Sequence, residues 1–232
     1  MPGLVVMSVA FSASWQPGLI GPLRAVSVVR SSSSSCVTTS DQDASFVLPS
    51  VLRPPGPTPE LPLLTDSDIQ KLAEGVRVQR QLLTGDVGGG FAVQDICASP
   101  GSVWRYVRDF DNYDSLIGTV RSATPYEPKV QVEGTFCYNF LVSRIRLQLN
   151  VRWCVNDDLR YASWTLERPS WVLLDSCGFW HVQPLPERPG FVRVWFCASV
   201  RLKQQVPGFV IRLVSRLGLA KACSWVSSMA YE

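Results

Sequence analysis

Residues 191–203 read FVRVWFCASVRLK, and polar and apolar side chains alternate along this stretch. Every even position from Val192 to Leu202 is apolar, whereas arginine or lysine occupies three of the odd positions. A period of two indicates a strand with one buried face and one solvated face, as in an antiparallel sheet. The stretch therefore predicts such a strand, with Trp195 on its polar side.

The same period runs through much of residues 120–203. In residues 145–153 the odd positions hold Ile, Leu, Leu, Val and Trp, and the even positions hold Arg, Gln, Asn and Arg. Shorter alternating runs occupy residues 162–166 and 172–182. Asn, Asp and Pro residues between the runs predict turns, and a change of phase near residues 142–144 predicts a bulge or a tight turn.

Helix signals flank these strands. Thr65 can cap a helix start, because its side-chain oxygen precedes Asp68 by three residues. Ser99 followed by Pro100 marks a second start, with serine as the cap and proline at the first helical position. Apolar side chains then recur on one face of that helix, and a short further helix ends near Gly118.

The closing segment predicts a long amphipathic helix from about Val206. Phe209, Leu213 and Leu217 fall on one side of a helical wheel, and Arg212 and Arg216 fall opposite. We expect the apolar face of this helix to pack against the apolar face of the sheet.

A cluster of glycines, Gly85 and Gly88 to Gly90, precedes the strand-like run FAVQDI at residues 91–96. The cluster lacks the Gly-Lys-Ser/Thr sequence of a phosphate-binding loop and has no third glycine at the dinucleotide-binding spacing. We therefore expect these glycines to form a hairpin turn.

The first 45 residues differ in composition from the rest. Residues 1–40 contain two arginines and no acid, and the segment is rich in serine, which is typical of an organellar transit peptide. Because arginines are few, we expect a plastid destination, with the mitochondrion as the alternative and an untargeted tail as the second alternative. The predicted organisation is a transit peptide at 1–45, a Pro-rich linker at 46–64, a helix and strand extension at 65–87, and the main domain at 88–232.

Charge and composition exclude several classes of function. The chain of 232 residues has 22 Lys and Arg, 19 Asp and Glu and one His, for a net charge of +3. This charge is too small to indicate nucleic acid as a partner, and one histidine excludes a multi-histidine metal site. No run reaches the ~18 apolar residues of a membrane-spanning helix, so no transmembrane segment is predicted. The seven cysteines form no C-x-x-C pair and fit buried thiols in a reducing compartment.

The order of these elements resembles a known superfamily. The segments GGGFAVQDICASPGSVWRYVRDFDNY (88–113), GFWHVQPLPERPGFVRVWFCASVRL (178–202) and the closing helix VPGFVIRLVSRLGLAKACSWV (206–226) are similar to SRPBCC proteins, which include the START and pollen-allergen-like families. The nearest branch is that of polyketide cyclases/dehydrases and coenzyme Q-binding proteins. The resemblance implies an α+β helix-grip fold: a curved antiparallel sheet wrapped around a long C-terminal helix, with two short helices after the first strand and an apolar cavity inside. The resemblance thus implies that residues 88–232 form a START-like domain.

A helix-grip cavity implies a function in binding a hydrophobic small molecule, a lipid or a prenylquinone-like compound, for carriage or presentation. The side chains predicted to face the cavity are Leu147, Leu149, Val151, Trp153, Trp164, Trp180, Val194, Phe196, Phe209, Leu213 and Leu217. Filling of an ordinary core by these residues is the alternative. Beyond a bound prenylquinone or other lipid, we expect no cofactor and no metal.

The carboxy-terminal stretch carries no acid between Glu187 and Glu232. Its basic residues predict a peripheral contact with an anionic membrane surface through Arg212, Arg216 and Lys221, with a solvated helix face as the alternative.

Two other functions stay open from the sequence. A cyclase- or lyase-type enzyme would need an acid and a base in the cavity, but the parity of its strand points His181 away from it, and no catalytic residue is predicted. A protein-assembly factor without a ligand would use an exposed Trp195 as a contact, whereas a covered Trp195 would indicate packing.

Overall fold

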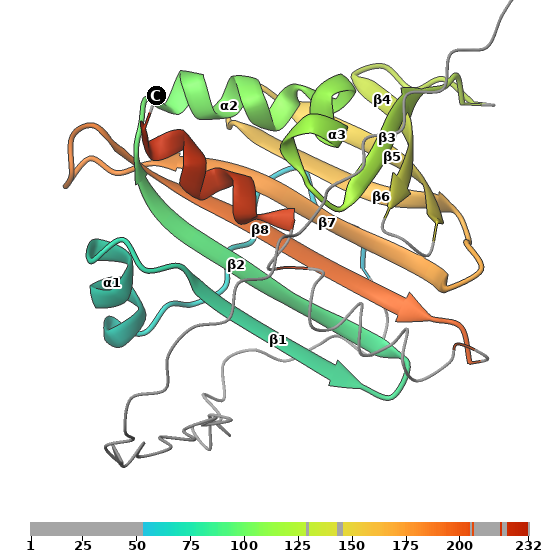
Figure 1. Cartoon of the computed structure of the whole chain (residues 1–232), viewed down its shortest axis with the longest axis horizontal. Coiled ribbons are helices and arrows are strands. Elements are labelled where there is room, and N and C mark those ends of the chain that lie inside the picture. Colours follow the sequence, from blue (N-terminus) through green and yellow to red (C-terminus); the bar gives the residue numbers. More distant parts are fainter. Residues whose placement is uncertain are drawn as a thin grey trace, which may run out of the picture. The chain divides into compact units, whose positions relative to one another are not determined.

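The alternating segments form one curved antiparallel sheet in the computed structural model, which describes residues 53–128, 130–142, 146–204, 206, 219 and 222–231 (Figure 1). The strands are β1 (Val78–Thr84), β2 (Val87–Cys97), β3 (Val120–Pro125), β4 (Thr135–Val142), β5 (Leu147–Asn156), β6 (Tyr161–Arg168), β7 (Leu173–Pro184) and β8 (Phe191–Leu202). Their order across the sheet is β1-β2-β8-β7-β6-β5-β4-β3, and all neighbours are antiparallel. The predicted α+β class with a curved antiparallel sheet is confirmed.

Short helices connect and cover these strands. They are α1 (Asp66–Ala73), α2 (Pro100–Arg108), the 3-10 turn η1 (Phe110–Asn112), α3 (Tyr113–Leu116) and the 3-10 helix η2 (Ser224–Tyr231). Thr65 and Asp68 form the predicted capping box, with hydrogen bonds of 3.0 and 3.2 Å. Ser99 caps α2 by accepting a bond from the backbone N–H of Ser102 at 3.0 Å, so both helix starts read from the sequence are confirmed.

The turn between β1 and β2 is shorter than the glycine cluster suggests. Only Gly85 and Asp86 form it, and Gly88, Gly89 and Gly90 lie inside β2, where they pair with β8. The prediction that all these glycines make the turn is therefore wrong. A Cβ atom at position 90 would lie 2.3 Å from the carbonyl oxygen of Arg80, so the close approach of β1 requires glycine there.

The outer face of the central strands is not solvated, in contrast to the prediction. Trp195 is 2% exposed, and its indole N–H donates to Oε1 of Gln183 at 3.1 Å. It belongs to a second apolar cluster that joins β1, β2, β6, β7 and β8 to α1. The buried members are Leu72, Val78, Phe91, Val93, Tyr161, Phe179 and Trp195. The covered position of Trp195 indicates packing rather than a contact site.

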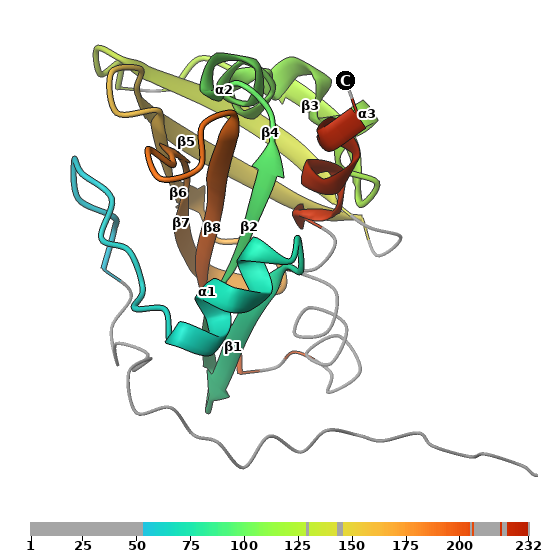
Figure 2. The same cartoon turned by 90° about the vertical axis from the view of Figure 1, so that its left-hand side faces the viewer.

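The described part of the predicted Pro-rich linker also contacts this outer face. Leu61 and Leu64 pack against the second cluster. The hydroxyl of Tyr161 donates to the carbonyl oxygen of Gly56 at 3.1 Å, and the thiol of Cys177 donates to that of Arg53 at 3.4 Å. Figure 2 shows this segment and the closing segment η2 on opposite sides of the sheet.

Two buried carboxylates hold the outer layer by ion pairs. Asp95 on β2 accepts two bonds from its cross-strand partner Arg193, at 2.7 and 3.0 Å. Asp68 on α1 accepts a bond of 2.5 Å from Arg80 on β1. Because each carboxylate has a guanidinium partner, the cost of removing its charge from water is offset.

Several sequence-based predictions lie outside the described residues. They concern the transit peptide, the first part of the linker, and most of the closing helix with Phe209, Leu213, Leu217, Arg212, Arg216 and Lys221. Of that closing segment the structure describes chiefly η2, in which Trp225 and Val226 are buried.

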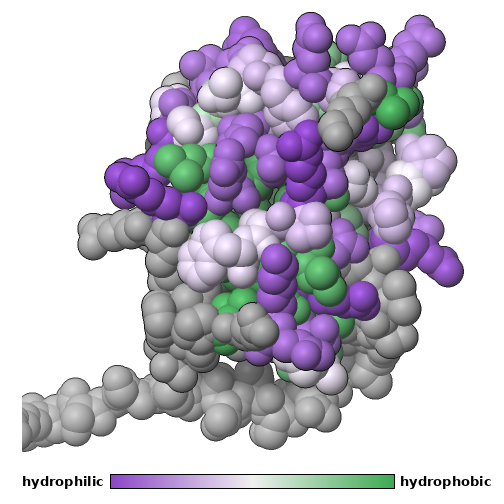
Figure 3. Space-filling view, turned by 90° about the vertical axis from the view of Figure 1, so that its right-hand side faces the viewer, coloured by the Kyte–Doolittle hydropathy of each residue, from purple (hydrophilic) through white to green (hydrophobic). Residues whose placement is uncertain are grey.

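The described residues contain no helix that is both long and apolar enough to span a membrane. Within the same ranges, no three His, Cys, Asp or Glu side chains are grouped so as to hold a metal ion. The six described cysteines are free thiols. Cys97 and Cys154 are exposed, which differs from the expectation of buried thiols, whereas burial raises the pKa of Cys177 to about 11. The side seen in Figure 3 is mainly hydrophilic, with small hydrophobic patches.

The packing of α1 predicts a large effect of one substitution on stability. Leu72 of α1 is fully buried against the outer face of the sheet, so Leu72→Ala should lower the free energy of unfolding by about 3 kcal/mol in urea titrations. Ile69 on the same helix is 47% exposed, and Ile69→Ala should change that free energy by less than about 0.5 kcal/mol. Equal effects of the two substitutions would show that α1 does not stabilise the sheet.

Candidate functional site

A cavity of about 820 Å³ lies on the inner face of the sheet, the face opposite α1. Strands β4 to β8 form its floor and far wall. The β1–β2 hairpin bounds one side and α3 with the start of β3 bounds another, while Leu219 and Ala222 contribute from the closing segment. Its described lining is mainly apolar and includes three tryptophans, Trp153, Trp164 and Trp180. A space of this size is within the range of about 300–1,000 Å³ that small-molecule sites occupy.

Small residues create much of this space. Gly88, Gly89 and Gly90 line the cavity from β2. Side chains at positions 88 and 90, which share the parity of the inward-facing Ala92, would project into it, and a Cβ atom at position 90 would lie 2.7 Å from Cδ1 of Leu219 in the same lining. Gly178 on β7 lies under Trp164, and a Cβ atom at position 178 would be 2.6 Å from Cζ2 of that indole. Glycine therefore lets the Trp164 ring lie close against the sheet instead of filling the cavity.

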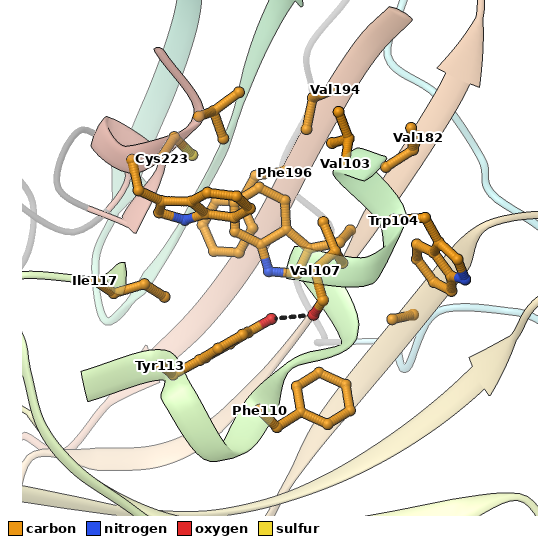
Figure 4. Close-up of a cluster of buried hydrophobic side chains, with 14 of the residues drawn as sticks. Val103, Trp104, Val107, Phe110, Tyr113, Ile117, Val182, Val194, Phe196 and Cys223 are labelled. Atoms are coloured by element: carbon orange, nitrogen blue, oxygen red, sulfur yellow. Dashed lines mark hydrogen bonds between the residues drawn. The ribbon is translucent and has the colours of Figure 1, made fainter. Parts of the chain in front are cut away.

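The remaining inner face is a filled core. Figure 4 shows Val103, Trp104 and Val107 of α2 beside Val182, Val194 and Phe196 of the sheet. Phe110 stacks on Trp153 with ring centroids 4.5 Å apart and planes at 19°. This aromatic cluster separates the region under α2 from the open cavity, and so gives the cavity a rigid end wall.

Few polar side chains of the described lining can still bind a ligand. The Tyr113 hydroxyl donates to the carbonyl oxygen of Val107 at 2.6 Å, as Figure 4 shows, and burial together with Asp109 raises its pKa. The Ser176 hydroxyl donates to the carbonyl oxygen of Ser199 at 3.1 Å. No Asp, Glu or His occurs in that lining, so its described part offers no pair of groups for general acid–base chemistry.

The outer rim of the cavity is less buried than its interior. Leu82 and Leu83 at the end of β1 are 43% and 40% exposed, whereas Trp180 in the interior is 2% exposed. Gln81 and Arg121 are also exposed, on β1 and β3 respectively. These residues define a mouth at the edge between β1 and β3.

Most of the described residues that were predicted to face a ligand do line the cavity. They are Leu147, Leu149, Val151, Trp153, Trp164, Trp180 and Phe196. Val194 does not: it packs in the filled core beside Cys223 and Val226, where the space is too small for a ligand. Phe209, Leu213 and Leu217 lie outside the described residues. Contact of any of these side chains with a ligand stays a prediction.

The sequence pattern did not predict the residues of the mouth, nor that Gly88 to Gly90 line the cavity. Arg121 and Gln81 are polar residues near the ends of short strands, where alternation gives no reliable face. Gly88 to Gly90 were read as a turn, although Phe91 directly after them begins the strand-like pattern. These glycines belong to the strand because their backbone pairs with β8, and that pairing is a tertiary contact that the local sequence does not reveal.

His181 lies on the outer face and not in the cavity lining, in agreement with its parity. Its ring packs edge-on against Tyr161, with centroids 6.4 Å apart, and Nδ1 lies 3.3 Å from the carbonyl oxygen of Arg160. Burial lowers the pKa of His181, although the hydrogen bonds to backbone oppose that change. The imidazole of His181 is therefore neutral in the folded protein at neutral pH.

No protein-family model matches the chain, and no curated protein matches it in sequence. Solved structures do resemble it. The ZhuI aromatase/cyclase from Streptomyces sp. R1128 has a TM-score of 0.52 at 11% identity, over 66% of this chain and 94% of that one. The di-domain aromatase/cyclase BexL of the BE-7585A biosynthetic pathway has a TM-score of 0.50 at 10% identity, over 72% and 54%. A STAR-related lipid transfer protein from Xanthomonas axonopodis has a TM-score of 0.48 at 8% identity, over 67% and 93%.

Likeness at such low identity concerns the fold. In its described residues the chain has the fold of these two aromatase/cyclases, which agrees with the curved antiparallel sheet that its sequence predicts, whereas most of the predicted long closing helix lies outside those residues. Within the described residues this fold is the curved eight-stranded sheet with its short helices.

The lowered pKa of the partly buried His181 predicts a pH dependence of stability. The unfolded state binds a proton near the ordinary histidine pKa of about 6.5, and the folded state binds it only at lower pH. The free energy of unfolding should therefore fall as the pH drops from 7.5 to 5.5, by at most about 1.4 kcal/mol per pH unit. Because His181 is the only histidine, His181→Asn should flatten this part of the curve. A curve that keeps its slope in the variant would contradict the assignment.

Proposed function

We propose that this protein binds a hydrophobic small molecule, a lipid or a prenylquinone-like compound, in the cavity and carries or presents it. The observation that supports the proposal most directly is the cavity itself, with its volume of about 820 Å³ and its mainly apolar described lining. An apolar tail transferred from water into such a space gains about 25 cal/mol for each Å² buried, before ordering costs.

The arrangement of the lining favours a ligand with a flat or branched apolar body. Trp153, Trp164 and Trp180 offer indole rings from three neighbouring strands, and they are held by packing rather than by loops. Rigid aromatic walls lose little conformational entropy when a ligand binds. The cavity is thus preformed for binding.

An enzyme of the cyclase or lyase kind is the second candidate, because two of the structures with a similar fold are aromatase/cyclases. Such chemistry needs an acid and a base that reach the substrate. The hydroxyls of Tyr113 and Ser176 are occupied by backbone carbonyls, and the described lining has no carboxylate or imidazole. Binding therefore explains the described residues better than catalysis does.

A peripheral membrane contact through Arg212, Arg216 and Lys221 would suit a carrier, since its ligand must enter from and leave to a lipid phase. We keep this contact and the plastid destination as part of the proposal. Replacement of Arg212 and Arg216 by Glu tests this contact. If the contact exists, the variant should bind anionic vesicles more weakly than the wild-type chain does.

Binding can be tested with neutral apolar probes. Decyl-plastoquinone should quench the tryptophan fluorescence of the full chain saturably, because three indoles line the cavity, and oleyl alcohol, which carries no quenching group, should displace it. Ala198→Leu adds bulk to the lining from β8 and should weaken binding about tenfold. Ala73→Leu adds the same bulk at an exposed position of α1 and should leave binding unchanged.

Native mass spectrometry then gives the stoichiometry, for which we expect one probe molecule per chain. Circular dichroism establishes that both variants are folded. Absence of saturable binding to every probe, or equal binding by the Ala198→Leu and wild-type chains, would contradict a ligand site in this cavity.

A further inference from the structure

A bulge in β3 places a charged side chain at the mouth of the cavity. Val120 pairs with Val142 of β4, but the next pair is Ser122 with Leu141, so Arg121 is the extra residue between two pairs. In a regular strand Val120 and Arg121 would face opposite sides of the sheet. Both instead line the cavity, because the bulge redirects the second side chain.

Arg121 is the only charged residue in the described lining of the cavity. Among the described residues, no carboxylate lies within 4.0 Å of its guanidinium, whereas Arg80, Arg108, Arg152, Arg188, Arg193 and Arg201 each have a carboxylate partner. The acid-free sequence from 188 to 231 adds no competing carboxylate from the closing segment. The charge at the mouth is thus left without an internal counter-ion in the described part of the chain.

The cavity is therefore polarised from its mouth to its interior. Arg121 is exposed at the mouth, and its guanidinium keeps contact with water. Trp180 and Phe196 lie in the interior, at 2% and 9% exposure, on an apolar floor. A ligand that matches this gradient has an apolar body inside and an anionic group at the mouth. A guanidinium binds carboxylate and phosphate oxygens through paired N–H donors.

We propose that the ligand is a single-headed anionic amphiphile, whose carboxylate or phosphate binds Arg121 while its apolar body fills the cavity. This inference rests on the proposed function and narrows its class of ligand. A neutral quinone head could accept a hydrogen bond from Arg121, but it would lack the stronger, charge-assisted pair that a carboxylate or phosphate forms. The site therefore favours one of two kinds of apolar ligand that the cavity alone would accept.

The test compares ligands that differ only in the head. Oleate and methyl oleate have the same chain, and oleyl phosphate distinguishes a phosphate head from a carboxylate. Their affinities for the full chain are measured below the critical micelle concentration by displacement of decyl-plastoquinone, followed as recovery of the tryptophan fluorescence. Oleate, oleyl phosphate or both should bind about tenfold more tightly than methyl oleate. Whichever anion is preferred identifies the head group.

Variants assign the preference to Arg121. Arg121→Gln should abolish the difference between the anion and the ester and leave the affinity for methyl oleate unchanged. Arg121→Lys should restore part of it, because the positive charge remains. Arg105→Gln removes the same charge from an exposed position on α2 outside the cavity lining, and it should keep the wild-type preference.

The outcomes separate this inference from the proposed function. Equal binding of anions and ester by the wild-type chain would overturn the anionic ligand. An undiminished preference in Arg121→Gln would overturn the role of Arg121 as the partner of the head group. Either result leaves the apolar site of the proposed function. Failure of all three probes and of the neutral probes to bind would overturn both.

Discussion

Strand β8 is buried on both faces, and the rest of the structure is arranged around this double burial. Val192 and Val194 face the filled core under α2 and η2, while Trp195 faces the cluster under α1. An antiparallel strand whose two faces are both apolar needs a covering layer on each side. The segment before the sheet supplies the outer layer, and α2 with the closing segment supplies the inner one. Residues more than 100 positions apart thereby become neighbours, as the bond from Tyr161 to Gly56 illustrates.

The cavity is the part of the inner face at which this packing is incomplete. Under α2, large side chains such as Phe110 and Trp153 meet and stack, so no room remains. Toward the β1–β2 hairpin the corresponding wall is made of glycines, and Gly178 lets Trp164 lie back against the sheet. The difference between core and cavity is thus one of residue volume along the same strands. It is not a difference in secondary structure.

The sequence predicts well what depends on local periodicity and poorly what depends on distant partners. The period of two places Trp153 and Trp180 on the inner face, and the capping residues Thr65 and Ser99 mark helix starts. The burial of Trp195 could not be predicted, because its cover comes from α1, more than 100 residues away.

Nor could alternation distinguish Phe196, which lines the cavity, from Val194, which fills the core two positions earlier. Both positions demand an apolar side chain. The orientation of Arg121 depends on the register of β3 against β4, which the sequence of β3 alone does not specify. The site was therefore predictable as an apolar face, but its boundaries and its charge were not.

The size of the cavity also constrains how the chain can be stable without a ligand. A dry void costs about 24 cal/mol per Å³, which for about 820 Å³ is near 20 kcal/mol and exceeds the typical stability of a domain. An enclosed dry void of this size would not persist, so in a chain without a ligand water would enter past the exposed residues of the mouth. Water on apolar indole and aliphatic walls lacks hydrogen-bond partners, so its release favours an apolar ligand. The cavity that weakens the packing of the core thus supplies the driving force for binding. A bound ligand would in turn raise the stability of the chain by mass action.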